Sequence, residues 1–521
     1  RGLGDVYKRQ AHESRVKKSL LNARVNLIFY FLILVLSFFS RKIFLDCLGT
    51  DFVGLTSTLQ NLLGFLNLAE LGIGSAIGFV LYKPLFDRDE QRINEIISVF
   101  GYLYRLIGFI ILGAGLILAC FLPLIFPNTD FEMRIIFFAY FSFLISSLIG
   151  YFANYKQTLL GADQKNYVVT AYFQTVTMVK TLIQMLSAYW TQSYYLWIVI
   201  ELSFGIIYSF ILNWKINQVY PWLQSEVRQG RSLFKKYPEV LRYTKQLFIQ
   251  KISYTVQYQT TPFLIYTFVN LSVVALYGNY TIITDKLAQF VNTFLESSGA
   301  SIGNLIAEGN SSKIKKVFWE LLSIRYFIGG TIAFAIYILI EPFIALWLGT
   351  EYVLPHIILV LICINIFISY TRGGVMQFLF GYGLFSDVWA PISEIVINLS
   401  IAIICGSMWG LPGVLLGGIT SQILIVGIWK PYFLFTRGFH ESIWNYWANI
   451  LKYVFALFFS WFVTLKFIKP IINISASESF TSWIVFAVIY VGIYVLMTFV
   501  LLYATSAGMR SFVHRFIKIK L

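Results

Sequence analysis

The chain has 521 residues and a formal net charge of +15, with 58% apolar and only 12% charged residues. An ordinary soluble domain carries about 25% charged residues, so the composition excludes a soluble enzyme, and the 18% aromatic content excludes a disordered chain. The apolar residues gather in long runs, each close to the ~20 residues that a membrane-spanning helix needs. The sequence therefore predicts an all-α polytopic membrane protein.

Fourteen apolar runs succeed one another along the chain. The segment Arg1–Gln10 shares no pattern with the rest of the sequence. We interpret it as a segment that does not belong to the natural protein and exclude it from the prediction of the fold. The basic residues Arg15, Lys17 and Lys18 then lead into the first run, which is typical of a transmembrane helix held from the inside. The predicted membrane spans lie at 22–46, 53–82, 97–126, 133–160, 167–190, 195–213, 246–270, 275–305, 317–345, 354–381, 387–408, 412–436, 447–468 and 483–505.

Lysine and arginine concentrate in alternate loops between these spans, which sets the predicted orientation. The opposite loops are short and nearly free of positive charge. With an even number of spans, both termini are expected in the cytoplasm. The net charge of +15 therefore mainly reflects the orientation of the chain in the membrane. Because the positive residues are spread over many short loops, a nucleic-acid partner is disfavoured. The positive loops carry Lys83, Arg88 and Arg92; Lys156 and Lys165; the segment 215–245; Lys313, Lys315 and Lys316; and Lys430 and Arg437.

The longest polar segment, 214–245, divides the chain. Its apolar residues recur at helical spacing among basic ones, so we expect a cytoplasmic linker with an interfacial helix on the membrane surface. Six spans precede it and eight come after it. The expected organisation is an N-terminal six-helix lobe at 11–213, the linker, a C-terminal six-helix lobe at 246–436, and two extra helices with a basic cytoplasmic tail at 437–521.

An internal repeat links the two halves at an offset of 220 residues. Arg105 matches Arg325, and the segment Gln157–Gly161 matches Gln377–Gly381. The offset preserves the direction of the spans, so we predict two parallel repeats related by an axis along the membrane normal. Transporters built in this way place their substrate site between the repeats.

Ionisable side chains deep in a bilayer cost at least ~2.5–3.5 kcal/mol, so they mark cavities or partners. Arg105 and Arg325 recur at matching positions and are expected to face one central cavity. For Arg41 an equal alternative to facing a cavity is that its side chain extends along the helix to the membrane surface. The cations predicted to line a cavity for an anionic group such as a pyrophosphate are Arg105, Arg325, Lys180, Arg372 and Arg41. The carboxylates that are candidates for ion coupling, or for structural pairing with these cations, are Glu70, Asp285, Glu296 and Glu394.

The sequence contains no recognisable catalytic or metal-binding arrangement. Its four cysteines and four histidines are scattered without the spacing of metal ligands. The outer loops are too short to hold a catalytic domain, which disfavours a membrane glycosyltransferase or polymerase. We therefore expect a transporter rather than an enzyme, with no cofactor.

One region resembles a known family. The run Leu66-Asn-Leu-Ala-Glu-Leu-Gly-Ile-Gly-Ser-Ala-Ile-Gly78, with Leu81-Tyr-Lys-Pro-Leu85 and Asp87-Arg-Asp89 after it, is similar to the second-helix region of bacterial polysaccharide flippases. These are O-antigen and capsular repeat-unit exporters of the multidrug/oligosaccharidyl-lipid/polysaccharide (MOP) superfamily. The resemblance covers the whole chain in span count, but its sequence specificity rests mostly on residues 41–108.

The resemblance implies a V-shaped cationic cavity in a protein of the bacterial inner membrane. It also implies that a polyprenyl-pyrophosphate-linked oligosaccharide moves from the inner to the outer leaflet by alternating access, for polysaccharide or lipopolysaccharide biosynthesis. The partners would be this lipid-linked substrate, membrane lipid and other polysaccharide assembly proteins, with H+ or Na+ as a coupling ion if transport is coupled. The alternative is an ion-coupled exporter of small amphipathic compounds. Drug-exporting relatives often use an acidic residue in the first helix, and this first span has none between Arg24 and Leu45.

Overall fold

The computed structural model describes residues 2–70, 73–127, 129–163, 165–295, 302, 305–306, 308–384, 386–472 and 474–520. Helices make up the regular structure of these residues, which include no strand. Ten of the described helices are long and apolar enough to cross a membrane. The predicted class is confirmed: the chain is an all-α polytopic membrane protein.

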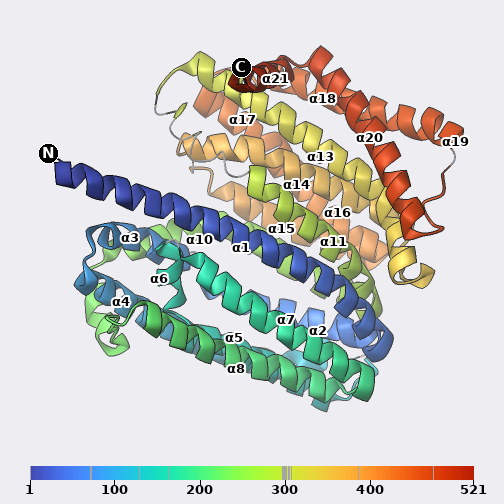
Figure 1. Cartoon of the computed structure of the whole chain (residues 1–521). Helices are drawn as coiled ribbons and strands as arrows, with labels where there is room; N and C mark the ends of the chain where they lie inside the picture. The colour runs from blue at the N-terminus through green and yellow to red at the C-terminus, as the bar shows by residue number, and fades with distance from the viewer. Residues whose placement is uncertain are drawn as a thin grey trace. The chain divides into compact units, whose positions relative to one another are not determined.

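The chain forms two compact units, which divide at Thr267 and Phe268. This division falls at the end of a helix, later than the lobe boundary at 245/246 that the polar segment suggests. The helices of unit 1 can be traced in blue to green in Figure 1. They are α1 (Gly2–Leu48), α2 (Thr50–Leu66), η1 (Asn67–Glu70), α3 (Ile73–Asp87), α4 (Glu90–Ile125), α5 (Met133–Ala153), α6 (Gln157–Ala162), α7 (Asn166–Thr191), α8 (Tyr194–Val219), η2 (Val227–Gln229), α9 (Gly230–Phe234) and α10 (Pro238–Phe268).

Unit 1 is held together by long helices packed along their length. Helix α7 packs on both α1 and α8, and α5 packs on both α4 and α8. The predicted span 53–82 is not one helix, because α2 ends at Leu66 and the 3-10 turn η1 separates it from α3. The polar residues Asn67 and Glu70 fall in this break and turn toward Tyr151 of α5. The break therefore brings polar groups into the unit rather than simply connecting two helices.

The segment between α8 and α10 lies on the end of α4. The backbone N–H of Gln224 donates to Asn94 at 2.8 Å, and that of Glu226 donates to Ser98 at 2.9 Å. Val227 is buried and reaches the space beside Gly101. The segment thus forms the short pieces η2 and α9 in place of the expected interfacial helix. The side chain of Val227, in η2, packs on the protein rather than on lipid.

A polar cluster fastens the end of this segment to α4. The Lys236 ammonium lies 2.6 Å from the Glu95 carboxylate, and the Tyr237 hydroxyl donates to the same oxygen at 2.6 Å. Burial, and after it the hydrogen bond to Glu95, raises the pKa of Tyr237. The phenol therefore stays protonated and remains a donor, so that the linker stays attached to unit 1.

Unit 2 contains the C-terminal helices, drawn in yellow to red in Figure 1. Its central helix α13 packs on α14, α18, α20 and α21. The two helices that come after the repeat, α18 and α20, thus belong to this unit. The elements are α11 (Leu271–Leu295), α13 (Ser311–Trp347), η4 (Thr350–Tyr352), α14 (His356–Gly381), α15 (Trp389–Trp409), α16 (Leu411–Ser421), η5 (Gln422–Trp429), α17 (Lys430–Leu434), η6 (Phe435–Phe439), α18 (Trp444–Val463), η7 (Thr464–Ile468), α19 (Lys469–Ile472), α20 (Phe480–Thr505) and α21 (Ala507–Lys520).

Helices α15 and α16 form a closely packed hairpin in unit 2. Gly410 turns the chain between them with a φ of 64°, a conformation that favours glycine. A methyl group at Gly413 would overlap the carbonyl oxygen of Cys405, and one at Gly417 would overlap that of Asn398. The two backbones therefore touch, as small residues allow in membrane helices.

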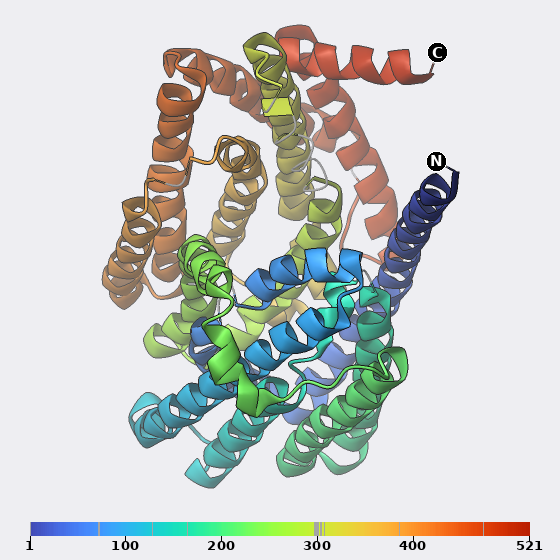
Figure 2. The same ribbon diagram turned by 90° about the vertical axis from the view of Figure 1, so that its left-hand side faces the viewer.

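The last helix, α21, crosses the ends of α13 and α20 (Figure 2). Ser506 caps it by accepting from the N–H of Met509 at 3.2 Å. Arg515 pairs with the buried Glu320 of α13 at 2.6 Å. A methyl group at Gly508 would overlap the carbonyl oxygen of Trp319, so this helix also sits directly on its neighbour's backbone. The basic C-terminal segment is thus a packed part of unit 2.

Candidate functional site

Lys180, one of the predicted cavity cations, forms an ion pair inside unit 1. Its ammonium lies 2.7 Å from Glu201, and each side chain is 20% exposed. Gln184, one turn along α7, donates to the other Glu201 oxygen at 3.0 Å and to the Trp197 carbonyl at 3.3 Å. The group joins α7 to α8 and carries no net charge. Its geometry matches the structural alternative, in which an embedded cation pairs with a carboxylate.

Glu70 lies in the break between α2 and α3 and is surrounded by hydroxyl groups. Tyr104 of α4 donates to one carboxylate oxygen, and the Tyr151 hydroxyl lies 2.8 Å from the other. The same hydroxyl lies 2.9 Å from the side-chain oxygen of Asn67. Among the residues that the structure describes, none places a cationic nitrogen within 4 Å of Glu70. This carboxylate is therefore stabilised by neutral donors, an arrangement suited to a group that exchanges a proton or a cation.

Arg325 is 3% exposed and lies inside unit 2. Its guanidinium donates to the carbonyl of Tyr370 in α14 at 3.3 Å and to that of Leu295 in α11 at 3.2 Å. A methyl group at Gly373 would overlap the guanidinium, so this glycine provides the space that Arg325 occupies. The arginine thus ties three helices of one unit together through their backbone.

Arg105 lies in a different environment from its repeat partner. It is exposed on α4, beside the exposed apolar side chains of Leu106 and Phe109. Within the described part of the chain, no carboxylate pairs with it. The repeat predicts equal surroundings for Arg105 and Arg325, and the structure does not provide them, because only Arg325 faces a glycine that leaves room for a guanidinium. A shared cavity for the two remains a prediction.

The structure places the other predicted site residues that it describes on α1, α11, α14 and α15. Arg41 is half-buried on α1, and Arg372 is half-buried on α14. Asp285 is exposed on α11, Glu394 is half-buried on α15, and both have partners. Glu296 lies outside the described residues. Over the same described ranges, no group of three or more His, Cys, Asp or Glu side chains is placed to hold a metal ion.

The contacts among Lys180, Gln184 and Glu201 could have been predicted from the sequence. Gln184 and Glu201 are equally distant from the short turn between α7 and α8, so an antiparallel hairpin brings them face to face. Lys180 lies one turn from Gln184 on the same side. Tyr151 carries no such signal, because its contact with Glu70 depends on how α5 lies beside the break at η1.

The fold of the chain is shared with solved structures of other proteins. No protein-family model matches the chain, and no curated protein sequence matches it. The structure is similar to that of "Lipid II flippase MurJ" in an inward closed conformation, with a TM-score of 0.61, 13% identity, and coverage of 93% of this chain and 98% of that one. It is also similar to an inward-facing "multidrug resistance MATE family transporter of the MOP superfamily", with a TM-score of 0.58, 14% identity, and coverage of 79% and 97%. The chain therefore shares the fold of these proteins.

Proposed function

We propose that this protein is a flippase for a polyprenyl-pyrophosphate-linked oligosaccharide. It moves the lipid-linked glycan from the cytoplasmic to the outer leaflet of a bacterial inner membrane by alternating access, and it serves polysaccharide biosynthesis such as that of O-antigen. The observation that carries the proposal is the extent of the fold shared with the lipid II flippase, which takes in nearly the whole chain. A shared fold of this length is long enough to include the two helices beyond the repeat, α18 and α20.

The distribution of charge supports an anionic substrate. The embedded carboxylates of Glu201, Glu320 and Asp387 each pair with a cation inside their own unit. Arg105, in contrast, is exposed, as a residue that meets substrate must be. A guanidinium recognises phosphate oxygens through two parallel hydrogen bonds. We therefore place Arg105 first among the proposed pyrophosphate contacts, with Arg41 and Arg372 as further ones.

One observation favours the alternative, an ion-coupled exporter of small amphipathic compounds. Glu70 has tyrosine and asparagine around it, and the described residues give it no cationic partner. Intramembrane carboxylates of this kind often belong to proton relays. In the flippase that we propose, the same carboxylate would serve as the coupling group rather than as the substrate site.

The test is a flipping assay in proteoliposomes that contain a fluorescent polyprenyl-pyrophosphate oligosaccharide. Arg105→Gln removes the cation but keeps a polar side chain, so we expect about tenfold weaker substrate affinity at normal protein abundance. Arg325→Gln is the matched control. It should lower the amount of folded protein instead, because the carbonyls of Tyr370 and Leu295 lose their donor.

The two candidate functions give opposite patterns in this assay. The flippase requires that the wild-type protein moves the lipid-linked glycan and does not expel small amphipathic compounds. Efflux of such compounds, blocked by Glu70→Gln while the glycan stays in its original leaflet, would establish the exporter. Normal flipping by Arg105→Gln would remove the cationic contact from the mechanism.

A further inference from the structure

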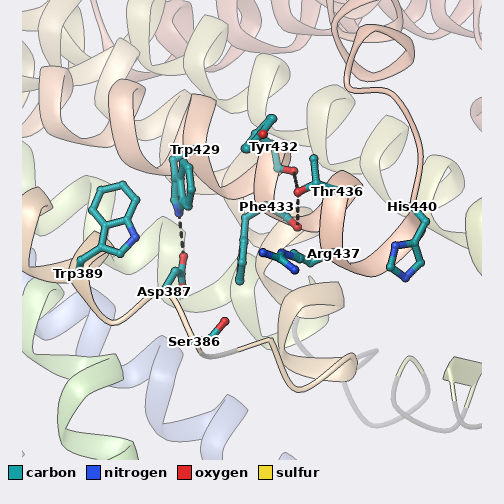
Figure 3. A pocket seen from close by; sticks show the side chains of 9 residues that line it. All are labelled: Ser386, Asp387, Trp389, Trp429, Tyr432, Phe433, Thr436, Arg437 and His440. Atoms are coloured by element: carbon teal, nitrogen blue, oxygen red, sulfur yellow. Dashed lines mark hydrogen bonds between the residues drawn. The ribbon is translucent and has the colours of Figure 1, made fainter.

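A pocket of about 540 Å³ opens in unit 2 where the start of α15 meets the segment η5–α17–η6. Figure 3 shows its side chains, with Trp389 at one end and His440 at the other. The rings of Trp429 and Phe433 lie between them, and Asp387 lies beneath Trp429. The volume falls within the range of small-molecule sites, and its lining includes none of the cations or carboxylates that the sequence predicts for the transport cavity.

The acidic residue of the pocket is already neutralised. Asp387 and Lys430 are both buried and lie 2.7 Å apart, and the Trp429 indole donates to the same carboxylate at 3.0 Å. A buried pair of this kind persists because each ion satisfies the other. The pocket therefore has a preformed polar floor without net charge.

Arg437 gives the pocket its positive charge. In Figure 3 its guanidinium extends from η6 toward the ring of Phe433 and the segment that carries Ser386. The residue is exposed, and no carboxylate of the described residues forms an ion pair with it. Thr436 is not a donor to the pocket, because its hydroxyl bonds to the carbonyl of Tyr432 at 2.8 Å. The available donors thus include Arg437, His440 and Ser386.

The local backbone explains why these donors converge. Both η5 and η6 are π-helical, a rare geometry that is frequent at functional sites. Hydrogen bonding from residue i to i+5 widens each turn, so the π turn of η6 changes the direction in which Arg437 would leave an α-helix. The chain then turns at His440 with a φ of 54°, which ends the helix at the rim of the pocket.

Exposed apolar side chains continue away from the pocket along both of its walls. At the start of α15 and along it they are Val388, Ile392 and Val396, spaced by one helical turn. On the facing segment, Leu424 and Ile428 lead in the same manner to Tyr432. Helix α15 contacts η5, so the two segments that carry these stripes run side by side. A cationic pocket that ends a pair of apolar stripes matches a molecule with an anionic head and a hydrocarbon tail.

We propose that this pocket binds the phosphate headgroup of an anionic membrane phospholipid. The phosphate accepts hydrogen bonds from Arg437, His440 and Ser386, its glycerol lies against Trp389, and an acyl chain runs along the stripes on α15 and η5. Tryptophan and tyrosine at the membrane interface suit this position. The net positive charge selects an anionic lipid over a zwitterionic one, whose ammonium would meet Arg437.

The experiment measures lipid binding to the purified, delipidated full chain by native mass spectrometry. Phosphatidylglycerol is titrated against phosphatidylcholine, and glycerol 3-phosphate is the soluble probe. We expect preferred binding of phosphatidylglycerol, weakened about tenfold by Arg437→Gln, because a charge-assisted contact is lost. Arg510→Gln, which removes another exposed arginine, on α21, should leave this binding unchanged.

Trp389→Ala is a second variant that leaves the charge intact, and it should weaken phosphatidylglycerol binding as well. Equal affinity of Arg437→Gln and wild type would overturn the site. Phosphatidylcholine bound as tightly, with the same dependence on Arg437, would overturn the selection by charge. Glycerol 3-phosphate bound as tightly as the lipid would overturn the lipid assignment, because the pocket would then take a soluble phosphate ester.

Discussion

At the scale of single residues, the embedded charges of this protein have mostly local partners. Lys180 neutralises Glu201, and Lys430 neutralises Asp387, each at 2.7 Å. Arg325 donates to backbone carbonyls of α14 and α11. Such contacts reduce the cost of placing an ion in a medium of low polarity. The cations that can meet a substrate are therefore fewer than the positive charges that the sequence places inside the spans.

The pair of Lys180 and Glu201 gives a direct test of this view. Lys180→Met leaves a half-buried carboxylate without its cation and should destabilise the protein by about 1–3 kcal/mol. Adding Glu201→Gln should restore most of that stability, since the remaining groups are then neutral. Thermal melting in detergent measures both effects. A double variant that melts no higher than Lys180→Met would contradict the assignment of Lys180 as a structural residue.

At the scale of elements, glycine decides how closely helices approach. Gly413 lets α16 rest on the backbone of α15, Gly373 makes room for Arg325, and Gly508 lets α21 rest on α13. In each of the contacts at Gly413 and Gly508 the opposing atom is a backbone carbonyl, which cannot rotate away as a side chain can. These positions therefore limit how the neighbouring helices of unit 2 can shift relative to one another.

Gly413→Ala tests this role. The added methyl group must displace the Cys405 carbonyl, and we expect a loss of at least about 1–3 kcal/mol in stability, as for other overpacked cores. The control is Gly492→Ala in α20, where no atom lies within 4 Å of the added carbon. Thermal melting of both variants compares them. Equal melting temperatures would mean that α15 and α16 can separate at little cost.

At the scale of the whole molecule, the chain consists of two compact units of similar length, as the repeat suggests. The orientation in the membrane rests on the distribution of lysine and arginine. This distribution predicts that both termini and the segment 214–245 lie in the cytoplasm, and that the connection between α19 and α20 lies outside. The hydrogen bonds that fasten the segment to α4 then lie on the cytoplasmic side.

Cysteine labelling measures this orientation. In a chain whose four native cysteines are replaced, single cysteines are introduced at Ser232, Ser511 and Ser477. A membrane-impermeant maleimide added to intact cells should label only the cysteine at Ser477, which is exposed between α19 and α20. The other two should react after the cells are opened. Labelling at Ser232 or Ser511 in intact cells would reverse the topology.

The sequence predicts the helices of this fold well because apolar length alone defines a membrane span. It does not predict the break at Asn67–Glu70, since these residues lie inside an apolar run whose average hydropathy hides them. The partner of Lys180 could be predicted from the hairpin. The burial of Arg325 could not, because it depends on Gly373 and on carbonyls of two helices distant in sequence.

The contact between α15 and α16 also limits how unit 2 can change shape. Domain motions proceed either by shear, in which packed helices slide over one another, or by hinges at a few residues between rigid parts. Sliding of α16 along α15 would drive the Cα of Gly413 past the carbonyl groups against which it rests. In any rearrangement of unit 2, α15 and α16 must therefore move together as one rigid body. The backbone must then bend at the two ends of this hairpin, at Gly383 before α15 and in the π-helical turns after α16.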